Sequence, residues 1–325
     1  MVQKNLFSSW IFWVKVAIVT GIFLSILFSI WPYHPISISH TDHLDDRLID
    51  SKDEQKRITI IPDDPQAIDA AIESIGQEIL AETHPSAANK ASLKLEQLCG
   101  LYSDLCNKTT REGTYTDSQL LTYQLLMIYL IKQIDQRITT DGQVRSTISV
   151  LKHFQDSQGR RGSAGHTNIK LNTEKIGSYQ EYWEVLTHEL GHIVDLGVIQ
   201  GKQKTKDPLF TEFGQVQWAI DDPSLNFYGV SWQAENIRKK QVSFKDFVSG
   251  YAMQGVYEDF AESINMYFNH HALFVALAKE NSALNAKYQF IHTLFGGEYF
   301  REDTHNIASL TPETRPRDTT KIGRE

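Results

Sequence analysis

The amino-acid sequence predicts an α+β protein that is mainly helical, contains a small sheet and is preceded by one transmembrane helix. Three observations support this fold class. Apolar residues recur at helical spacing over residues 66–82 and 117–138, short β-branched segments with glycines between them fill residues 144–172, and one apolar segment occupies residues 10–31. Hydrophobic residues make up 41% of the 325 residues, which is typical of a globular chain rather than a disordered one.

The apolar segment of residues 10–31, "WIFWVKVAIVTGIFLSILFSIW", contains a single charge, Lys15. About 20 apolar residues suffice to cross a bilayer. Lys4 and Lys15 precede the centre of the span and Asp42 follows it, so the positive-inside rule predicts a cytoplasmic N-terminus and an extracytoplasmic remainder. The alternative is a signal peptide whose cleavage would give a secreted protein. Because no A-x-A site follows the span, we predict an uncleaved signal anchor and a single-pass protein of the cell membrane.

Net charge and cysteine content exclude two classes of function. The net charge is -8 and no run of Lys and Arg occurs, which excludes nucleic acid as a partner. Cys99 and Cys106 are the only cysteines and form no C-x-x-C pair, which excludes a zinc site built from thiolates. Outside the cytoplasm these two cysteines could form one local disulfide. The alternative of two buried free thiols stays open.

Three helices are predicted before the strands. Ile68, Ile72, Ile75 and Ile79 share one face of a helix over residues 66–82, and a second helix is expected at residues 91–98. Residues 117–138 are strongly apolar, and Asp117 at their start is a candidate for the N-cap. Because this third helix contains Lys132 and Asp135, we predict a buried core helix and not a second membrane span.

Two strands and a further helix are predicted next. Residues 144–154 and 166–172 are short and β-branched, and the glycine-rich residues 157–165 form a flexible connection between them. The sequence Ser178-Tyr-Gln-Glu181 is a capping box that opens a helix. Gly197 and Gly201 are expected to end it.

Composition divides the chain into four parts. The last of them is rich in Thr, Arg and Pro and is expected to be a disordered polar tail. Whether the helices of residues 62–140 form a domain of their own stays open. The parts are a cytoplasmic stub with the signal anchor at 1–31, a juxtamembrane linker at 32–61, a globular domain at 62–300 with its core at 144–300, and the tail at 301–325.

The helix that begins after Ser178 contains the motif H-E-x-x-H. His188 and His192 are four residues apart and share one helix face, with Glu189 beside them. In this arrangement two imidazoles bind zinc and the carboxylate takes a proton from the attacking water. The alternative is an ordinary amphipathic helix that happens to carry two histidines, so the interpretation requires a third ligand.

A carboxylate from another part of the chain is expected to be that ligand. The longer motif with a third histidine fails, because Asp195 and Val198 stand where it requires Gly and His. Glu212 and Glu258 are the two alternatives, and either could instead be a solvated surface acid. Glu262 follows Glu258 by one helical turn on the same face, where it could orient a ligand histidine. We therefore predict Glu258 as the ligand.

The segments "HELGHIVD" at residues 188–195 and "EDFAE" at 258–262, with Tyr251 seven residues before Glu258, resemble the lethal factor-like zinc metalloproteases. That family includes anthrax lethal factor and the clostridial Pro-Pro endopeptidases. The resemblance extends from about residue 165 to 295. It implies a zincin-like metalloprotease domain of the H-E-x-x-H gluzincin type, in which residues 166–172 are the edge strand that binds extended substrates. It also implies that Tyr251 stabilises the oxyanion.

The predicted function is a membrane-anchored zinc metalloendopeptidase, a hydrolase that cleaves an extracytoplasmic protein or peptide with one Zn²⁺ per chain. The cleavage specificity is not predicted. The alternatives are a catalytically silent membrane-tethered binding or scaffold protein on the same fold, and a zinc hydrolase of a non-peptide bond. The predicted roles are zinc ligands His188, His192 and Glu258, general base Glu189, oxyanion donor Tyr251, and Glu262 and Asp195 as groups that orient the ligand imidazoles.

Overall fold

The computed structural model describes residues 61, 63–81, 93–212, 215–301 and 316–322, which belong to one compact unit. The predicted signal anchor at residues 10–31 and nearly all of the predicted linker lie outside these residues. No helix in the described part of the chain is both long and apolar enough to cross a membrane. The predicted fold class is therefore corrected for the described residues, which form a mainly helical fold with a small sheet and without a transmembrane helix.

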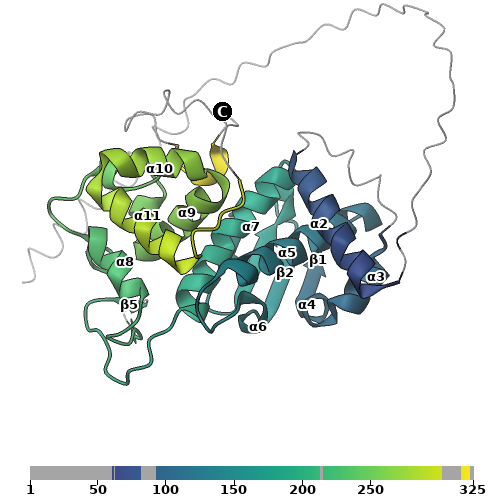
Figure 1. The fold of residues 1–325 in the computed structure, drawn as a ribbon, viewed down its shortest axis with the longest axis horizontal. Helices are drawn as coiled ribbons and strands as arrows, with labels where there is room; N and C mark the ends of the chain where they lie inside the picture. The colour runs from purple at the N-terminus through teal and green to yellow at the C-terminus, as the bar shows by residue number, and fades with distance from the viewer. Residues whose placement is uncertain (1–60, 62, 82–92, 213–214, 302–315, 323–325) are drawn as a thin grey trace, which may run out of the picture. The chain divides into compact units, whose positions relative to one another are not determined.

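Among the described residues, five α-helices and a sheet precede the helix that carries the H-E-x-x-H motif (Figure 1). The helices are α2 (Pro65–Ala81), α3 (Leu95–Leu101), α4 (Ser103–Lys108), α5 (Asp117–Arg137) and α6 (Val144–Thr147). The strands are β1 (Thr109–Glu112), β2 (Val150–Phe154), β3 (Gly162–Ala164) and β4 (Asn168–Asn172). A disulfide joins Cys99 in α3 to Cys106 in α4 and so decides between the two alternatives for the cysteines.

The helices α2 and α5 follow the predicted pattern. Ile68, Ile72, Ile75 and Ile79 of α2 are buried, and α5 is buried along most of its length as a core helix. Its cap is Thr116 and not Asp117, because the hydroxyl of Thr116 accepts a hydrogen bond from the backbone N–H of Gln119 at 3.2 Å.

The sheet differs from the prediction in both of its expected strands. Residues 144–147 form α6 instead of the start of a strand, because Asp135 accepts hydrogen bonds from the backbone N–H groups of Val144 and Arg145 at 2.6 and 3.0 Å. The strand order is β1-β2-β4-β3, with β1, β2 and β4 parallel and β3 antiparallel to β4.

Residues 166–172 are therefore not an edge strand, which is the second error in the predicted fold class. Residues 168–172 form β4, which is paired on both sides. The strand at that end of the sheet is β3, which lies within the glycine-rich segment that was predicted to be a connection. The residues of β3 are Gly, Ser and Ala, whose low strand propensity conceals a strand from a sequence pattern.

The motif helix α7 (Tyr179–Ile193) lies between the N-terminal elements and a second group of helices (Figure 1). The hydroxyl of Ser178 caps it by accepting from the N–H of Glu181 at 3.1 Å. It continues as a π-helical turn, η3 (Val194–Val198), rather than running unbroken to the predicted glycines. The second group consists of α8 (Ser224–Ser231), α9 (Val256–Asn269), α10 (His271–Glu280) and α11 (Ser282–Leu294), with the hairpins β5 (Thr211–Glu212)–β6 (Gln215–Val216) and β7 (Trp232–Ala234)–β8 (Ile237–Arg238).

A close contact between α7 and α9 fixes the register of the two helices. A side chain at Gly191 would place its Cβ 2.9 Å from Cα of Ala261, so only glycine allows the helices to approach this closely. Gly191 follows Glu189 by two residues and precedes His192, so the contact brings the motif histidines against α9.

Part of the predicted polar tail is packed into the domain. Residues 316–322 contain the 3₁₀ turn η7 (Thr319–Lys321), and Thr319 and Thr320 are buried. The carbonyl of Arg317 accepts a hydrogen bond from the N–H of Tyr251 at 2.6 Å. For these residues the expectation of disorder is wrong, because long-range contacts made by Thr319 and Arg317 compensate the polar composition.

Candidate metal centre

His188, His192 and Glu258 form a group that could hold a metal ion. One ligand atom of each residue lies within 4.8 Å of the others. The Nε2 atoms of His188 and His192 lie 3.2 and 3.4 Å from Oε2 of Glu258. The two histidines come from α7 and the glutamate from the first turn of α9, so the group depends on the contact between these helices. Within the described part of the chain, no other cluster of three such residues has this geometry.

Glu262 orients the first histidine from the opposite side of its ring. Its Oε1 lies 2.8 Å from Nδ1 of His188. Its Oε2 accepts hydrogen bonds from the hydroxyl of Ser249 at 2.6 Å and from the backbone N–H of Thr319 at 2.8 Å. A carboxylate at Nδ1 favours the tautomer that carries its proton there, which leaves the Nε2 lone pair directed at the metal group. The predicted role of Glu262 requires this contact with His188.

Negative charge dominates the electrostatics of the group. Burial alone would lower the pKa of His188, but its hydrogen bonds to Glu258 and Glu262 outweigh burial and raise this pKa well above its usual value. Burial would raise the pKa of Glu258, whereas the hydrogen bonds and charges of His188 and His192 hold it far below its usual value. The free group therefore favours a cation between its carboxylates.

Glu189 lies on the same side of α7 as the histidines and faces β3. Its carboxylate is buried, and burial raises its pKa. Its Oε2 has no hydrogen-bond partner among the described residues. A Cβ at Gly162 would lie 2.9 Å from Cδ of Glu189 and closer still to Oε1. Because glycine has no side chain, position 162 of β3 leaves room for this carboxylate. The sequence pattern gave no signal for this role of Gly162.

Tyr251 points at the metal group from the other side. Its hydroxyl donates to Oε1 of Glu258 at 3.1 Å, and its ring centroid lies 5.8 Å from that of His188. Burial, followed by the nearby charge of Glu258, raises the pKa of Tyr251 above its usual value, which keeps the phenol protonated.

Two further acids considered from the sequence lie outside the group. Glu212, the alternative ligand, forms a hydrogen bond with His166, in which Oε2 of Glu212 lies 2.6 Å from Nε2 of His166. Asp195 accepts a hydrogen bond from the hydroxyl of Tyr228 at 2.6 Å instead of contacting a ligand imidazole. Burial raises the pKa of Asp195 to about 8. Of the two residues predicted to orient the ligands, the structure therefore brings only Glu262 to a histidine.

A cavity of about 420 Å³ opens onto the centre. His188, Glu189 and Tyr251 form part of its wall. Arg160, Arg161 and Gly162 contribute from the segment that enters β3, and Arg317, Asp318 and Thr320 contribute from the C-terminal segment. Neither segment was predicted to belong to the site, since one was interpreted as a connection and the other as a tail.

Comparison of the chain with protein-family models, with curated proteins and with solved structures gives no match. The resemblance to the lethal factor-like metalloproteases therefore stays a prediction that depends on the residues of the two motifs and Tyr251.

Proposed function

We propose that this protein is a zinc-dependent peptidase whose active site is the group of His188, His192 and Glu258. One observation carries the proposal. Two imidazole nitrogens and a carboxylate oxygen converge in a buried position, and the carboxylate of Glu189 and the phenol of Tyr251 stand on either side of them.

The three side chains fit zinc in both chemistry and spacing. Nitrogen and carboxylate ligands bind zinc at about 2.0–2.2 Å, and a tetrahedral ion then separates its ligand atoms by about 3.4 Å. The separations of 3.2 and 3.4 Å between the histidine nitrogens and Oε2 of Glu258 are close to this value. Three protein ligands are also the number that catalytic zinc sites use.

Glu189 is positioned to act as the general base. Zinc, when bound, supplies a Lewis acid that polarises the scissile carbonyl and makes a water molecule more acidic. Glu189 removes a proton from that water as the water oxygen bonds to the carbonyl carbon. It then gives the proton to the amine nitrogen as the C–N bond breaks. The raised pKa of Glu189 suits both steps, because a proton shuttle works best when its pKa approaches the working pH.

Tyr251 supports the negative charge that develops on the carbonyl oxygen. Its protonated hydroxyl lies at the metal group and can exchange its hydrogen bond with Glu258 for one to the oxyanion. The hydrogen bond from the backbone N–H of Tyr251 to the carbonyl of Arg317 fixes the backbone of Tyr251.

The disulfide gives independent support for a location of the described domain outside the cytoplasm. Disulfides persist in oxidising surroundings and are rare in the cytosol. The Cys99–Cys106 bond is therefore consistent with action outside the cytoplasm.

Zinc content and hydrolysis of the full chain test the proposal together. Elemental analysis should find one zinc per chain in the wild type and in Glu212→Ala, and almost none in Glu258→Ala. Glu189→Gln should retain zinc while hydrolysis of a peptide mixture falls by about a thousandfold, because the proton acceptor is lost. A folded wild type without zinc, or a Glu189→Gln variant with undiminished turnover, would reject the proposal.

A further inference from the structure

Two arginines line the cavity of the metal centre without an acidic partner. Arg160 precedes β3 and Arg317 belongs to the C-terminal segment, and both are exposed. Neither forms an ion pair or a side-chain hydrogen bond with any residue in the described ranges. Arg160 and Arg317 are more than 150 positions apart in the sequence, and the fold brings both of them to the wall of the cavity that also contains Glu189.

Two acids on the same wall, Asp318 and Glu262, already have partners, and the third is the proposed general base Glu189. Arg161, beside Arg160, donates to Glu181 at 2.8 Å, to Thr320 at 2.7 Å and to Asp318. Asp318 is thus paired with Arg161 and does not neutralise its neighbour Arg317. Glu262 is engaged by His188, Ser249 and Thr319. The cavity therefore presents two uncompensated positive charges beyond the metal group.

Both arginines are attached to backbone that the fold holds firmly. The carbonyls of Pro316 and Arg317 accept hydrogen bonds from Gly250 and Tyr251 at 3.2 and 2.6 Å, which ties this segment to the chain at the oxyanion donor. The carbonyl of Arg161 accepts from the N–H of Asn172 at 2.7 Å and anchors the other segment to the sheet. The backbone from which the two side chains extend is therefore held at the wall of the cavity.

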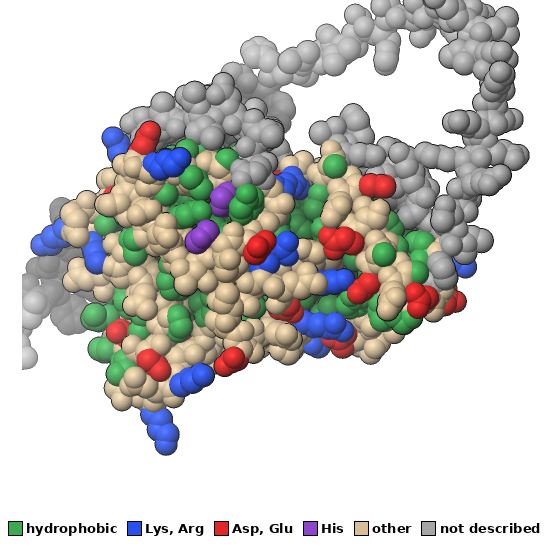
Figure 2. Space-filling model, in the orientation of Figure 1, with side chains coloured by type: hydrophobic (Ala, Val, Ile, Leu, Met, Phe, Trp, Pro, Cys, Tyr) green, Lys and Arg blue, Asp and Glu red, His purple; other side chains and the backbone are tan. Residues whose placement is uncertain are grey.

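We infer that Arg160 and Arg317 form a subsite for a carboxylate of the substrate, close to the bond that is cleaved. The inference rests on the proposed peptidase function and adds a substrate class to it. A guanidinium group binds a carboxylate through two parallel hydrogen bonds and is the side chain best suited to that recognition. The overall net charge of -8 does not predict this preference, and acidic and basic side chains lie interspersed over the face drawn in Figure 2.

A peptide carboxylate has two sources, an Asp or Glu side chain and the C-terminus. Cleavage sites should be mapped by mass spectrometry in two mixtures of N-acetylated dodecapeptides with the same random sequences, one with C-terminal amides and the other with free C-termini. If side chains are bound, Asp and Glu should be enriched about tenfold at one position near the cut in both mixtures. If the terminus is bound, cleavage should occur near the free C-terminus and should fall about tenfold in the amides.

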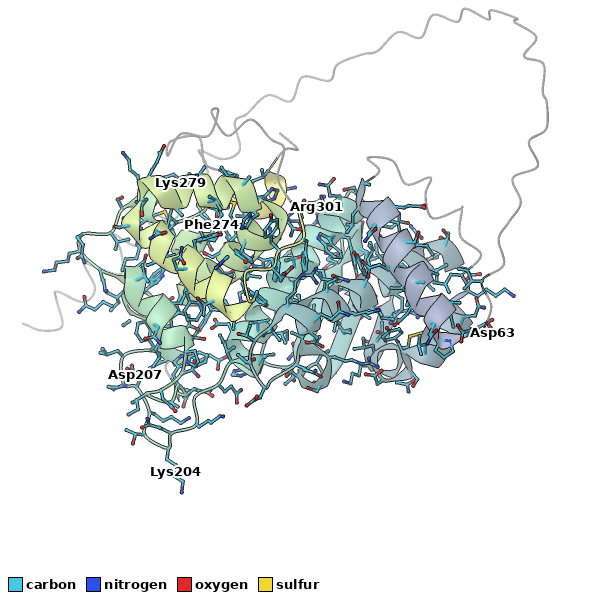
Figure 3. The ribbon with its side chains drawn as sticks, viewed as in Figure 1. Asp63, Lys204, Asp207, Phe274, Lys279 and Arg301 are labelled. Carbon is cyan, nitrogen blue, oxygen red and sulfur yellow. A yellow bond between two sulfur atoms is a disulfide. The ribbon has the colours of Figure 1, made fainter. Side chains whose placement is uncertain are left out.

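The double variant Arg160→Gln with Arg317→Gln should remove either preference, so that this variant cleaves acidic and neutral peptides, or free and amidated peptides, at equal rates. The matched controls are Arg238→Gln and Lys204→Gln, which remove exposed charges outside the cavity wall. Figure 3 shows Lys204 at the outer end of the loop between α7 and α8, directed away from the helices. Cleavage with no acidic or terminal preference, or with a preference that survives in the double variant, would overturn the subsite.

A binding measurement separates failure of the subsite from failure of the peptidase function. Fluorescence anisotropy should compare labelled capped hexapeptides that contain one Asp or one Asn, with the zinc-loaded Glu189→Gln chain and with the same chain lacking both arginines. Binding of the Asp peptide about tenfold tighter than the Asn peptide, only where the arginines are present, supports the subsite even if no peptide is cleaved. Equal binding of these two peptides and of the Asn peptide with a free C-terminus rejects the subsite, even if the wild type proves to be a peptidase.

Discussion

Two buried histidines, His153 in β2 and His188 in α7, show opposite electrostatic behaviour in the same domain. Their exposed fractions are 2% and 7%. Burial lowers the pKa of His153 to about 4, with a smaller contribution from the charge of Arg111. His188 is as deeply buried, yet its pKa is raised because Glu258 and Glu262 contact its two nitrogens.

The difference lies in the partners and not in the burial. Nε2 of His153 is 2.8 Å from the hydroxyl of Tyr182, and the ring lies among Tyr123 and Tyr182. A neutral phenol satisfies the imidazole but does not favour its charged form. Around His188 the acceptors outnumber the donors, which is the composition expected of a cation site. A buried histidine with neutral partners is therefore part of the packing, whereas one among carboxylates is a candidate ligand.

The largest expected difference is in zinc content, between a substitution of His188 and a substitution of His153. His188→Ala should abolish zinc binding, because it removes a ligand together with the imidazole that Glu262 orients. Hydrolysis should then fall by a thousandfold or more. His153→Phe should keep one zinc per chain, since the phenyl ring retains the packing and loses only the hydrogen bond to Tyr182, which is not part of the metal group. Elemental analysis of both variants is the measurement. Equal zinc content in the two would remove the distinction between the histidines.

A pH dependence of stability should follow from His153. In the unfolded chain this histidine takes up a proton near pH 6.5, whereas in the folded chain it does so only near pH 4. Between these values the unfolded state binds more protons, so stability is lost as the pH falls from 6.5 to 4, by about 3 kcal/mol at most.

This contribution can be isolated by comparing the wild type with His153→Gln in chelator, so that loss of zinc plays no part. Urea unfolding at pH 7 and pH 4.5 should show that the free energy of unfolding falls more steeply with acid in the wild type than in the variant. Identical slopes in the two chains would show that His153 is not buried in its neutral form.

A smaller effect is expected from the group that orients His188. Glu262→Gln retains the size of the side chain but leaves one acceptor oxygen, so an amide that accepts from Thr319 and Ser249 turns its NH2 group toward Nδ1 of His188. Affinity for zinc should fall about 10- to 100-fold, as competition with a chelator would measure. Glu184→Gln is the matched control, because Glu184 of α7 is, like Glu262 of α9, a fully buried glutamate, but it does not belong to the metal group. A loss as large in this control would assign the effect to general destabilisation.

The sequence predicted the parts of the site that a helical repeat places together. His188, Glu189 and His192 share a face because of their spacing. Glu262 follows Glu258 by one turn, which made its role at His188 predictable. The same reasoning failed for Asp195, which lies in the π-helical turn Val194–Val198 and accepts a hydrogen bond from Tyr228, because a sequence pattern does not reveal this distant partner.

Contacts between distant segments could not be predicted in the same way. The strand β3 has no β-branched residue, and the C-terminal segment has the composition of a tail. Both become ordered through long-range partners, such as the bonds from Arg161 to Asp318 and Thr320. Local pattern contains no information about such partners. The sequence therefore predicted the wall that contains His188 and Glu189 but not the wall formed by β3 and the C-terminal segment.

The smallest effect in this series is expected at Gly162, a residue of that missed wall. Gly162→Ala would add a Cβ that overlaps the carboxylate of Glu189, and Glu189 would have to rotate away from its position. Hydrolysis should fall about tenfold, since the base is displaced but not removed. Zinc content should stay at one per chain, because Gly162 does not touch the three ligands. Gly100→Ala is the control, since a Cβ at Gly100 would meet no atom within 4 Å. If Gly162→Ala lost zinc together with activity, β3 would support the ligands rather than the base, and the cavity wall would be part of the metal centre itself.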